Sequence, residues 1–261
     1  MMDPPKVEAC ADALLAAERD RVPIPPLTER WPAISALEAY AIQERIVATR
    51  LAAGETIVGW KVGLTSKAMQ DQLGVDQPDY APILSGWFPP EGESIPFDAL
   101  IAARGEAEIA FELSSPLRGP GVTAADVRAA TRGVRPAIEV IDSRIEAWKI
   151  RLPDTIADMA SSARVVVGGP LMPLDDLDLA TVEVAFERNG EVVARGVGSA
   201  VLGDPAAAVA WAANTLGSLG VTLEAGHIVM PGAMHASVPA ARGDTFRATF
   251  DGIGSVEVRF A

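Results

Sequence analysis

The spacing of apolar residues predicts helices in the first part of the chain. Apolar positions recur at helical intervals over Val7–Arg21, and the segment Val22–Thr28, which contains three prolines, interrupts the pattern. A second helix is predicted to begin after Ser35, because Glu38 three residues later completes the sequence signature of a capping box. Gly54 follows the far end of this helix, as is typical of helix C-termini.

The rest of the chain shows short runs with the composition of strands. These runs are rich in Val, Ile and Phe, are bounded by glycine or proline, and lie at Ile57–Val62, Glu106–Leu113, Val134–Ile141, Arg164–Val167, Val182–Arg188, Asp244–Phe250 and Ser255–Phe260. Asn189-Gly190 predicts a tight hairpin, and one helix is predicted over Asp204–Leu219. Because strands and helices do not alternate regularly, we expect an α+β fold rather than a doubly wound sheet. Residues 1–55 would form a helical portion and residues 56–261 a β-rich domain.

The composition is that of an ordinary globular protein and narrows the range of partners. Hydrophobic residues make up 49% and charged residues 22% of the 261 positions. The formal net charge of -13 repels phosphate backbones and acidic membrane surfaces, so we expect neither nucleic-acid nor membrane partners. No apolar stretch approaches the roughly 20 residues that a membrane-spanning helix needs.

Cysteine usage and the N-terminal segment favour a cytoplasmic protein. Cys10 is the only cysteine, which excludes a disulfide within the chain and thiolate zinc clusters, and which fits a reducing compartment. Residues 1–11 carry acids and prolines where a signal peptide would have a basic patch and an apolar run. We therefore expect the protein in the cytoplasm.

Two glutamates share one face of a predicted strand. With a period of two residues, Glu106 and Glu108 point to one side of the strand, while Ala107 and Ile109 point to the other. Adjacent carboxylates repel each other, so in an apolar setting one must take up a proton or meet a cation. The alternative is a solvated acidic face, and this segment alone does not decide between the two.

A third glutamate favours the cation. Glu139 lies between apolar residues on both sides, where a lone charge is expensive unless it is paired or bound to a metal. Carboxylates without histidine form an oxygen site suited to Mg²⁺ or Mn²⁺ and poorly suited to zinc. His227 and His235 lie late in the chain without ligand-like spacing, and for each a structural role is the simpler interpretation.

A lysine and a loop are weaker candidates. Lys61 interrupts an apolar strand, where it either extends to water or is buried with a lowered pKa that fits it for proton transfer. The loop Gly74–Pro82 contains two acids and two prolines and follows a short helix that is predicted to begin near Thr65 or Ser66. Such a loop either acts as a lid over a site or only connects two elements.

Taken together, several segments resemble the 2-keto-4-pentenoate hydratase family. They are Gly59–Ser66, Gly74–Asp79, Glu106–Glu108, Glu139–Arg144 and Gly252–Val256. The family includes 2-hydroxypenta-2,4-dienoate hydratases, 2-oxohept-4-ene-1,7-dioate hydratases and 4-oxalocrotonate decarboxylases, and belongs to the fumarylacetoacetate hydrolase fold group. The resemblance runs from about residue 30 to the C-terminus. It implies a mixed, mainly antiparallel β-rich domain after the N-terminal helices.

The resemblance also implies a set of site residues. The metal ligands would be Glu106, Glu108 and Glu139, the proton-handling residues Lys61 and Asp79, and the substrate-binding positions Leu64, Ser161 and Gly232. Two positions depart from the family pattern. Gly105 stands where the family usually has Ile or Val, and Met159 where Asn is usual. The first would loosen the ligand strand and the second would alter the pocket.

The implied activity is the metal-dependent hydration of 2-hydroxypenta-2,4-dienoate to 4-hydroxy-2-oxopentanoate, in the degradation of aromatic compounds. The alternatives are 4-oxalocrotonate decarboxylase and 2-oxohept-4-ene-1,7-dioate hydratase. We favour the first hydratase because Gly74–Asp79 and Ser143–Trp148 look more like the hydratases.

Two other classes of function are disfavoured. Enzymes of this fold that hydrolyse a C–C bond are expected to activate water with a histidine, and no histidine precedes Glu224 in this chain. A non-catalytic protein of this fold is disfavoured because all five metal-binding and proton-handling positions are intact. The family also implies a small 2-oxo acid substrate and a homo-oligomer, a pentamer or a decamer.

Overall fold

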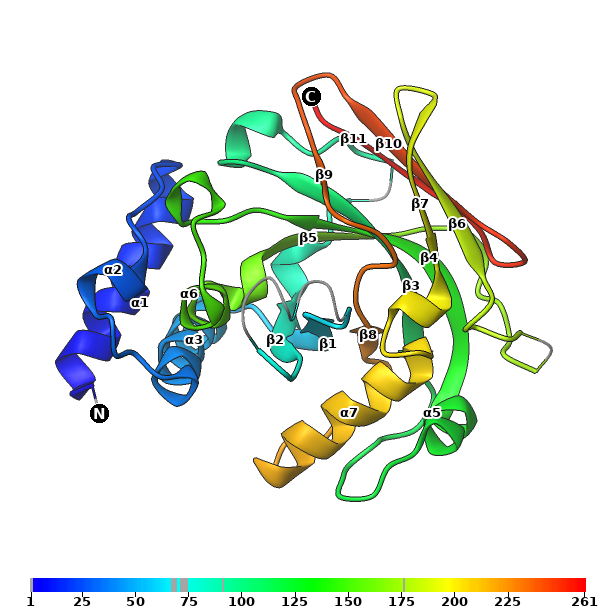
Figure 1. Cartoon of the computed structure of the whole chain (residues 1–261), viewed down its shortest axis with the longest axis horizontal. Helices are drawn as coiled ribbons and strands as arrows, with labels where there is room; N and C mark the ends of the chain where they lie inside the picture. Colours follow the sequence, from blue (N-terminus) through cyan, green and yellow to red (C-terminus); the bar gives the residue numbers. More distant parts are fainter. Residues whose placement is uncertain (1, 67–69, 71–74, 91, 176) are drawn as a thin grey trace.

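The computed structural model describes residues 2–66, 70, 75–90, 92–175 and 177–261. Three helices precede the sheets in the chain (Figure 1), and further helices lie between the strands. The α-helices are α1 (Pro4–Asp20), α2 (Leu27–Arg30), α3 (Ala36–Ala52), α5 (Ala124–Ala130), α6 (Leu152–Ala157) and α7 (Pro205–Ser218). Short 3₁₀ turns are η1 (Ser85–Trp87), η2 (Phe97–Ala99), η3 (Glu146–Trp148), η4 (Met159–Ser161) and η5 (Gly198–Ala200).

The strands form two sheets. They are β1 (Ile57–Gly63), β2 (Asp79–Leu84), β3 (Arg104–Leu113), β4 (Thr131–Ile141), β5 (Ser162–Val167), β6 (Glu183–Arg188), β7 (Glu191–Val197), β8 (Ile228–Met230), β9 (Val238–Pro239), β10 (Thr245–Phe250) and β11 (Gly254–Arg259). The larger sheet has the order β2-β1-β8-β3-β4-β5, with β9 beside β3, and the smaller has the order β11-β10-β6-β7. Of the strand pairs described, β1–β8 is parallel and the others are antiparallel. The predicted α+β class, with a mainly antiparallel mixed sheet after N-terminal helices, is confirmed.

The predicted N-terminal helices are present with clear caps. The Asp3 side chain accepts a hydrogen bond from the Lys6 backbone N–H, so α1 begins a few residues earlier than its apolar pattern suggested. In α3 the expected capping box is formed, because Ser35 and Glu38 each bond the backbone N–H of the other.

The two faces of the larger sheet are covered by different layers. Ala107, Ile109 and Phe111 of β3 belong to an apolar core that includes residues of α7 and of the smaller sheet. The opposite face of β3 and β4 contributes Ala110 and Ala137 to a second core, which it shares with α1, α3 and α6. The N-terminal helices thus lie over the face of the sheet that carries the predicted carboxylates (Figure 1). The proposed division of the chain after residue 55 stays a prediction.

One element corrects the expected loop over Gly74–Pro82. Gly74 lies outside the described residues, as does most of the short helix predicted before it, but Asp79–Leu84 is strand β2. Prolines made this segment resemble a connection, yet β2 is an edge strand, where a missing backbone donor at Pro82 is tolerated. The helices α2, α5 and α6 were also not predicted, because four to seven residues carry too little periodicity.

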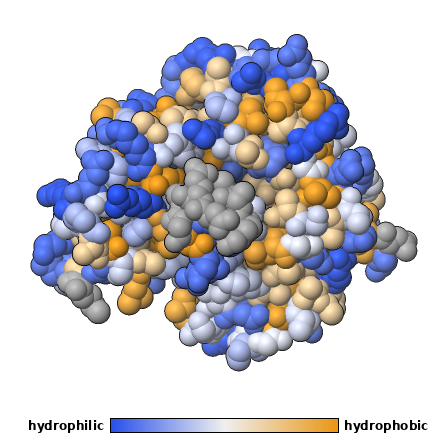
Figure 2. Space-filling view, in the orientation of Figure 1, coloured by the Kyte–Doolittle hydropathy of each residue, from blue (hydrophilic) through white to orange (hydrophobic). Residues whose placement is uncertain are grey.

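The surface carries polar and apolar side chains side by side. Figure 2 shows this mixture over the face seen in Figure 1. Among the described residues, none of the helices has the length and apolar character needed to cross a membrane.

Candidate active site

Three glutamates converge on two neighbouring strands. Glu106 on β3 is paired directly with Glu139 on β4, and Glu108 follows on the same face of β3. Each of the three can place a carboxylate oxygen within 4.8 Å of the others. Glu108 and Glu139 are buried and Glu106 is partly exposed. The period-two interpretation of β3 therefore correctly placed the side chains on one face.

Burial and mutual repulsion disfavour the charged forms of these groups. Burial, reinforced by the charge of Glu139, raises the pKa of Glu106 to about 7. The same causes raise the pKa of Glu108 well above its ordinary value. Glu108 Oε2 accepts a hydrogen bond of 2.8 Å from the Gly232 backbone N–H, and Glu139 Oε1 accepts one from the Ser162 hydroxyl.

The cluster fits a hard divalent cation. Among the described residues, neither Glu108 Oε1 nor Glu139 Oε2 has a hydrogen-bond partner although both are buried, which is a costly arrangement for carboxylate oxygens. One neighbouring cation, the Lys61 ammonium, cannot offset three carboxylates. All three donors are carboxylates, the ligand type that Mg²⁺ and Mn²⁺ prefer. Glu106, Glu108 and Glu139 are thus suited to hold such an ion.

Lys61 lies beside this cluster. Its ammonium is buried, 3.4 Å from Glu139 Oε2, and donates a hydrogen bond of 3.1 Å to the Ala160 carbonyl oxygen. Of the two alternatives for Lys61, the buried one is therefore correct, but the expected direction of its pKa is wrong. Burial lowers the pKa of Lys61, and the carboxylates of Glu139 and Asp79 raise it by more, so the net shift is upward.

Asp79 approaches the same place from strand β2. It is buried and pairs with Gly63 across β1 and β2, and its Oδ1 has no hydrogen-bond partner within the described part of the chain. Burial raises the pKa of Asp79, and the Lys61 charge opposes this. A side chain at Gly63 would place its Cβ 2.2 Å from Asp79 Oδ1 and 3.4 Å from Lys61 Nζ. Glycine at this position lets the two groups converge.

The predicted substrate-binding positions adjoin the cluster. Gly232, which donates to Glu108, has φ 119° and would collide with Thr65 if it carried a side chain. Leu64, next to Thr65, has φ 56°, and its carbonyl oxygen accepts from Gln70. Ser161 is buried and directly follows Ala160, the residue that holds Lys61. The structure brings these positions to the carboxylates, and their role toward a substrate remains a prediction.

The two departures from the family pattern have different surroundings. At Gly105 an added Cβ would lie 2.6 Å from the ring of Phe246 and 3.1 Å from that of Phe186. These rings occupy the space of the missing side chain, so β3 is packed rather than loosened there. Met159 is buried with φ 56°, a backbone conformation that asparagine adopts more easily.

A buried ion pair behind the cluster was not predicted. Arg144 and Asp158 pair through Arg144 Nε and Asp158 Oδ1, and both are buried. Arg144 Nη1 also donates to the carbonyl oxygen of Ser162, the residue that holds Glu139. Charged residues within apolar segments were the available signal, but their pairing depends on the folded chain.

The two histidines take the structural roles expected of them. His227 Nδ1 accepts from the Glu224 backbone N–H, and His235 Nε2 accepts from that of Ala107, which lies between two of the glutamates.

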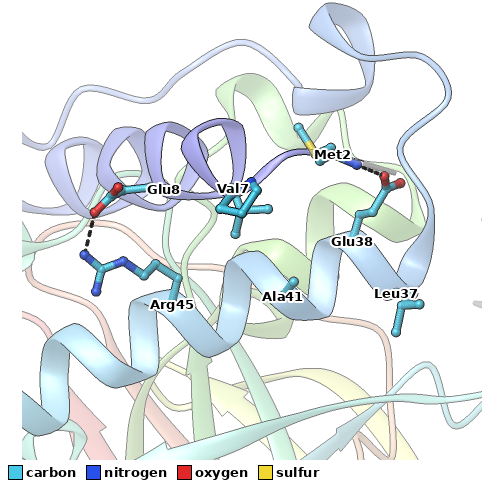
Figure 3. Close-up of a pocket in the computed structure, with 8 residues that line it drawn as sticks. Met2, Val7, Glu8, Leu37, Glu38, Ala41 and Arg45 are labelled. Atoms are coloured by element: carbon cyan, nitrogen blue, oxygen red, sulfur yellow. Dashed lines mark hydrogen bonds and ion pairs between the residues drawn. The ribbon is translucent and has the colours of Figure 1, made fainter.

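A groove of about 420 Å³ lies elsewhere, between α1 and α3. Figure 3 shows Val7 and Ala41 facing each other across it, with the Glu8–Arg45 ion pair at one end and the contact between Met2 and Glu38 at the other. It contains none of the predicted site residues.

Comparisons of the sequence and of the fold with known proteins point to the same family. The model of the fumarylacetoacetate (FAA) hydrolase C-terminal family matches residues 60–261. A 2-hydroxyhexa-2,4-dienoate hydratase of Comamonas testosteroni is 41% identical over 262 residues, covering 100% of this chain and 99% of the relative. A 2-hydroxypent-2,4-dienoate hydratase of Pseudomonas putida is 45% identical over 221 residues, covering 84% and 100%. A 2-oxo-hept-4-ene-1,7-dioate hydratase of Escherichia coli is 42% identical over 256 residues, covering 96% of each.

A solved structure agrees with these relatives. The 4-oxalocrotonate decarboxylase from Pseudomonas putida G7, complexed with magnesium and adipate, superposes with a TM-score of 0.96 at 39% identity, covering 100% of this chain and 99% of that one. The chain therefore belongs to the fumarylacetoacetate hydrolase family. Within it, the chain groups with the 2-keto-4-pentenoate hydratases and their decarboxylase relatives, as the resemblance had implied.

Proposed function

We propose that this chain is a metal-dependent hydratase that adds water to 2-hydroxypenta-2,4-dienoate and releases 4-hydroxy-2-oxopentanoate. The observation that carries the proposal is the convergence of Glu106, Glu108 and Glu139 with Lys61 and Asp79 on one face of the sheet. The hydratases at 41–45% identity support it.

The proposed chemistry assigns a task to each group. Glu106, Glu108 and Glu139 would hold Mg²⁺ or Mn²⁺, which supplies Lewis acidity toward the oxygens of a 2-oxo acid. Asp79, whose pKa is raised and whose Oδ1 accepts no hydrogen bond from any described residue, is suited to carry a proton to and from the substrate carbon chain. Lys61 stays an ammonium, and its position beside Glu139 lets it donate a hydrogen bond to an oxygen that gains negative charge.

A second candidate is the decarboxylation of 4-oxalocrotonate. The specific support is the full-length superposition on a 4-oxalocrotonate decarboxylase. Hydration of 2-oxohept-4-ene-1,7-dioate is a third candidate, supported by a relative of equal similarity. All three substrates are small 2-oxo acids (or their enols), so the carboxylate cluster alone suits each of them.

An ultraviolet time course with the three substrates distinguishes the candidates. Each substrate is supplied fresh to the protein with Mg²⁺, with Mn²⁺ and with excess chelator. We expect metal-dependent loss of the pentadienoate absorbance, with 4-hydroxy-2-oxopentanoate identified by mass spectrometry. CO₂ release from 4-oxalocrotonate at a higher kcat/KM would instead favour the decarboxylase. Turnover that survives the chelator would contradict the metal-dependent proposal, and so would a failure to turn over any of the three substrates.

We also propose that the protein acts in the cytoplasm as a homo-oligomer, a pentamer or a decamer, by analogy with the family. Light scattering coupled to size-exclusion chromatography measures the mass directly. A mass equal to the 27.3 kDa of one chain would contradict this part of the proposal.

A further inference from the structure

One buried guanidinium organises the segment between α6 and β5. Arg144 follows β4 and is 4% exposed. Its Nε donates to Asp158 Oδ1 and its Nη2 to the Asp158 carbonyl oxygen. Its Nη1 donates to the carbonyl oxygens of Asp142, at 2.6 Å, and Ser162, at 3.0 Å. Arg144 therefore holds both ends of the segment 158–162.

The backbone between these two ends is held in an unfavourable conformation. Met159, Ala160 and Ser161 have φ values of 56°, 49° and 57°, in the left-handed region that non-glycine residues avoid. Such a run persists only where the surrounding contacts over-determine it. The contacts to Arg144 supply this constraint, together with a hydrogen bond of 2.8 Å from the Asp142 backbone N–H to the Ser161 carbonyl oxygen.

The constrained segment reaches the carboxylate cluster at two points. The Ala160 carbonyl oxygen accepts from Lys61 Nζ at 3.1 Å, and the Ser162 hydroxyl donates to Glu139 Oε1. The positions of an ammonium and of a candidate metal ligand thus depend on the same five residues.

We propose that Arg144 is a positioning residue that sets Lys61 and Glu139 together through the segment 158–162. In this arrangement Glu139 Oε1 accepts a hydrogen bond from the Ser162 hydroxyl and Oε2 lies 3.4 Å from Lys61 Nζ, so the segment fixes the orientation of the carboxylate from both sides. Arginine suits the position because its planar fork reaches a carboxylate and three carbonyl oxygens at once, whereas lysine offers three donors from one point. The kinetic part of this inference rests on the proposed function, and the metal-binding part does not.

The test compares Arg144→Lys and Ser162→Ala with Arg128→Lys. Arg128→Lys is the control for the chemical change at a more exposed arginine, since Arg128 pairs with Asp204 at 3.3 Å and donates to the Leu177 carbonyl oxygen, where no site residue lies. The Kd for Mn²⁺ is measured by calorimetry without substrate, and kcat and KM with the pentadienoate. We expect Arg144→Lys to weaken Mn²⁺ binding about 10- to 100-fold and to lower kcat even at saturating Mn²⁺.

The two contacts of the segment with the cluster, Ser162 with Glu139 and Ala160 with Lys61, should affect the measurements differently. Ser162→Ala should weaken Mn²⁺ binding but, at saturating Mn²⁺, retain a higher kcat than Arg144→Lys, because the Ala160–Lys61 contact is kept. In the double variant, Ser162→Ala should add little to the Mn²⁺ defect of Arg144→Lys, since both act on Glu139 through one hydroxyl. Arg128→Lys should match the wild type.

Two outcomes would overturn the inference. In the first, Arg144→Lys lowers only the melting temperature and leaves the Mn²⁺ Kd and kcat within twofold of the wild type. In the second, the losses of Mn²⁺ binding free energy caused by Arg144→Lys and by Ser162→Ala add fully in the double variant. Should Arg144→Lys fail to fold, Asp158→Asn takes its place with the same criteria. A wild type inactive on all three acids defeats the proposed function alone, because the calorimetric comparison still decides the role of Arg144.

Discussion

The pKa of Lys61 is raised even though its burial alone acts to lower it. Its ammonium is 3.4 Å from Glu139 and shares its surroundings with Asp79, and these carboxylates outweigh the loss of hydration. At the scale of the residue, the charge of Lys61 therefore depends on its neighbours. The same carboxylates would bind the cation, whereas Lys61 itself would not, so a change at Lys61 can separate its part in turnover from metal binding.

Lys61→Ala should abolish most turnover without weakening metal binding. Removing a preorganised hydrogen-bond donor to an oxygen that gains negative charge typically costs about 10²- to 10³-fold in kcat. Removing a positive charge beside Glu139 favours a cation at the carboxylates, so the Mn²⁺ Kd should stay the same or decrease. Steady-state kinetics and calorimetry on the same preparation check both parts. Asp79→Ala provides the parallel case for turnover, and equal loss of turnover and metal binding in both variants would contradict the assigned roles.

Gly105→Val should destabilise the fold. The new side chain would meet the rings of Phe246 and Phe186, and overpacking of this kind costs about 1–3 kcal/mol. Urea unfolding measures the change in free energy. Combining Gly105→Val with Phe246→Leu should restore part of the loss, because the smaller side chain leaves room. A neutral single variant would show that the rings move aside without cost.

Single residues differ in how far the sequence reveals them. Glu106 and Glu108 could be predicted because a two-residue period puts them on one face, and Glu139 because it interrupts an apolar strand. Arg144 and Asp158 could not be paired, because their contact depends on how the turn after α6 folds back on β4. For Lys61 the burial was among the alternatives, but the direction of its pKa depends on partners from three other strands.

At the scale of elements, an irregular segment holds strand β3 in place. The residues after β8 bond both sides of Ala107: Met234 donates to its carbonyl oxygen, and His235 Nε2 accepts from its N–H. The Gly232 N–H bonds Glu108 in the same segment. The glutamate-bearing part of β3 is thus held by hydrogen bonds that strand pairing alone does not supply.

Acid should weaken this attachment through His235. Burial lowers the pKa of His235 below its ordinary 6.5, so the unfolded chain takes up a proton at a higher pH than the folded chain. The stabilising contribution of neutral His235 is present above about pH 6.5 and is lost as the pH falls through the folded pKa. His235→Gln keeps an acceptor for Ala107 without titrating. The stability advantage of the wild type over this variant, from urea unfolding in chelator, should narrow between pH 7.5 and 5.5. An advantage that grows with acid would contradict this.

Elements with a strong local signal could be predicted, and those defined by a neighbour could not. The capping box of α3 was visible in the sequence, and the Asn189-Gly190 hairpin joins β6 to β7 as expected. Strand β2 was missed because its identity comes from pairing with β1, and Pro82 is tolerated only because β2 is an edge strand.

At the scale of the whole molecule, the larger sheet keeps its charged chemistry on one face and its main apolar core on the other. Packing on the far side, against α7 and the smaller sheet, stabilises a sheet that carries several buried carboxylates. Their mutual repulsion opposes folding until a cation offsets it.

Glu108→Gln should therefore reverse its effect on stability with metal. In chelator the variant should melt at a higher temperature than the wild type, because one buried like charge is gone. With Mg²⁺ the wild type should gain more, by about 2.7 kcal/mol at 100 times Kd, because the variant has lost a ligand. Calorimetric melting in the two buffers tests this. Equal gains for both proteins with Mg²⁺ would argue against a metal site at Glu108.

Strand β8 has only three residues, Ile228–Met230, yet it separates two antiparallel pairs, β1–β2 and β3–β4. The first pair carries Lys61 and Asp79, and the second carries the three glutamates. The separation of these two groups of side chains thus depends on a strand that supplies none of them. A one-residue slip in the register of β8 would displace β1 relative to β3 while Lys61, Asp79 and the three glutamates stay unchanged in sequence. This short strand therefore offers protein engineers a way to change the spacing of the proposed site without replacing any of its residues.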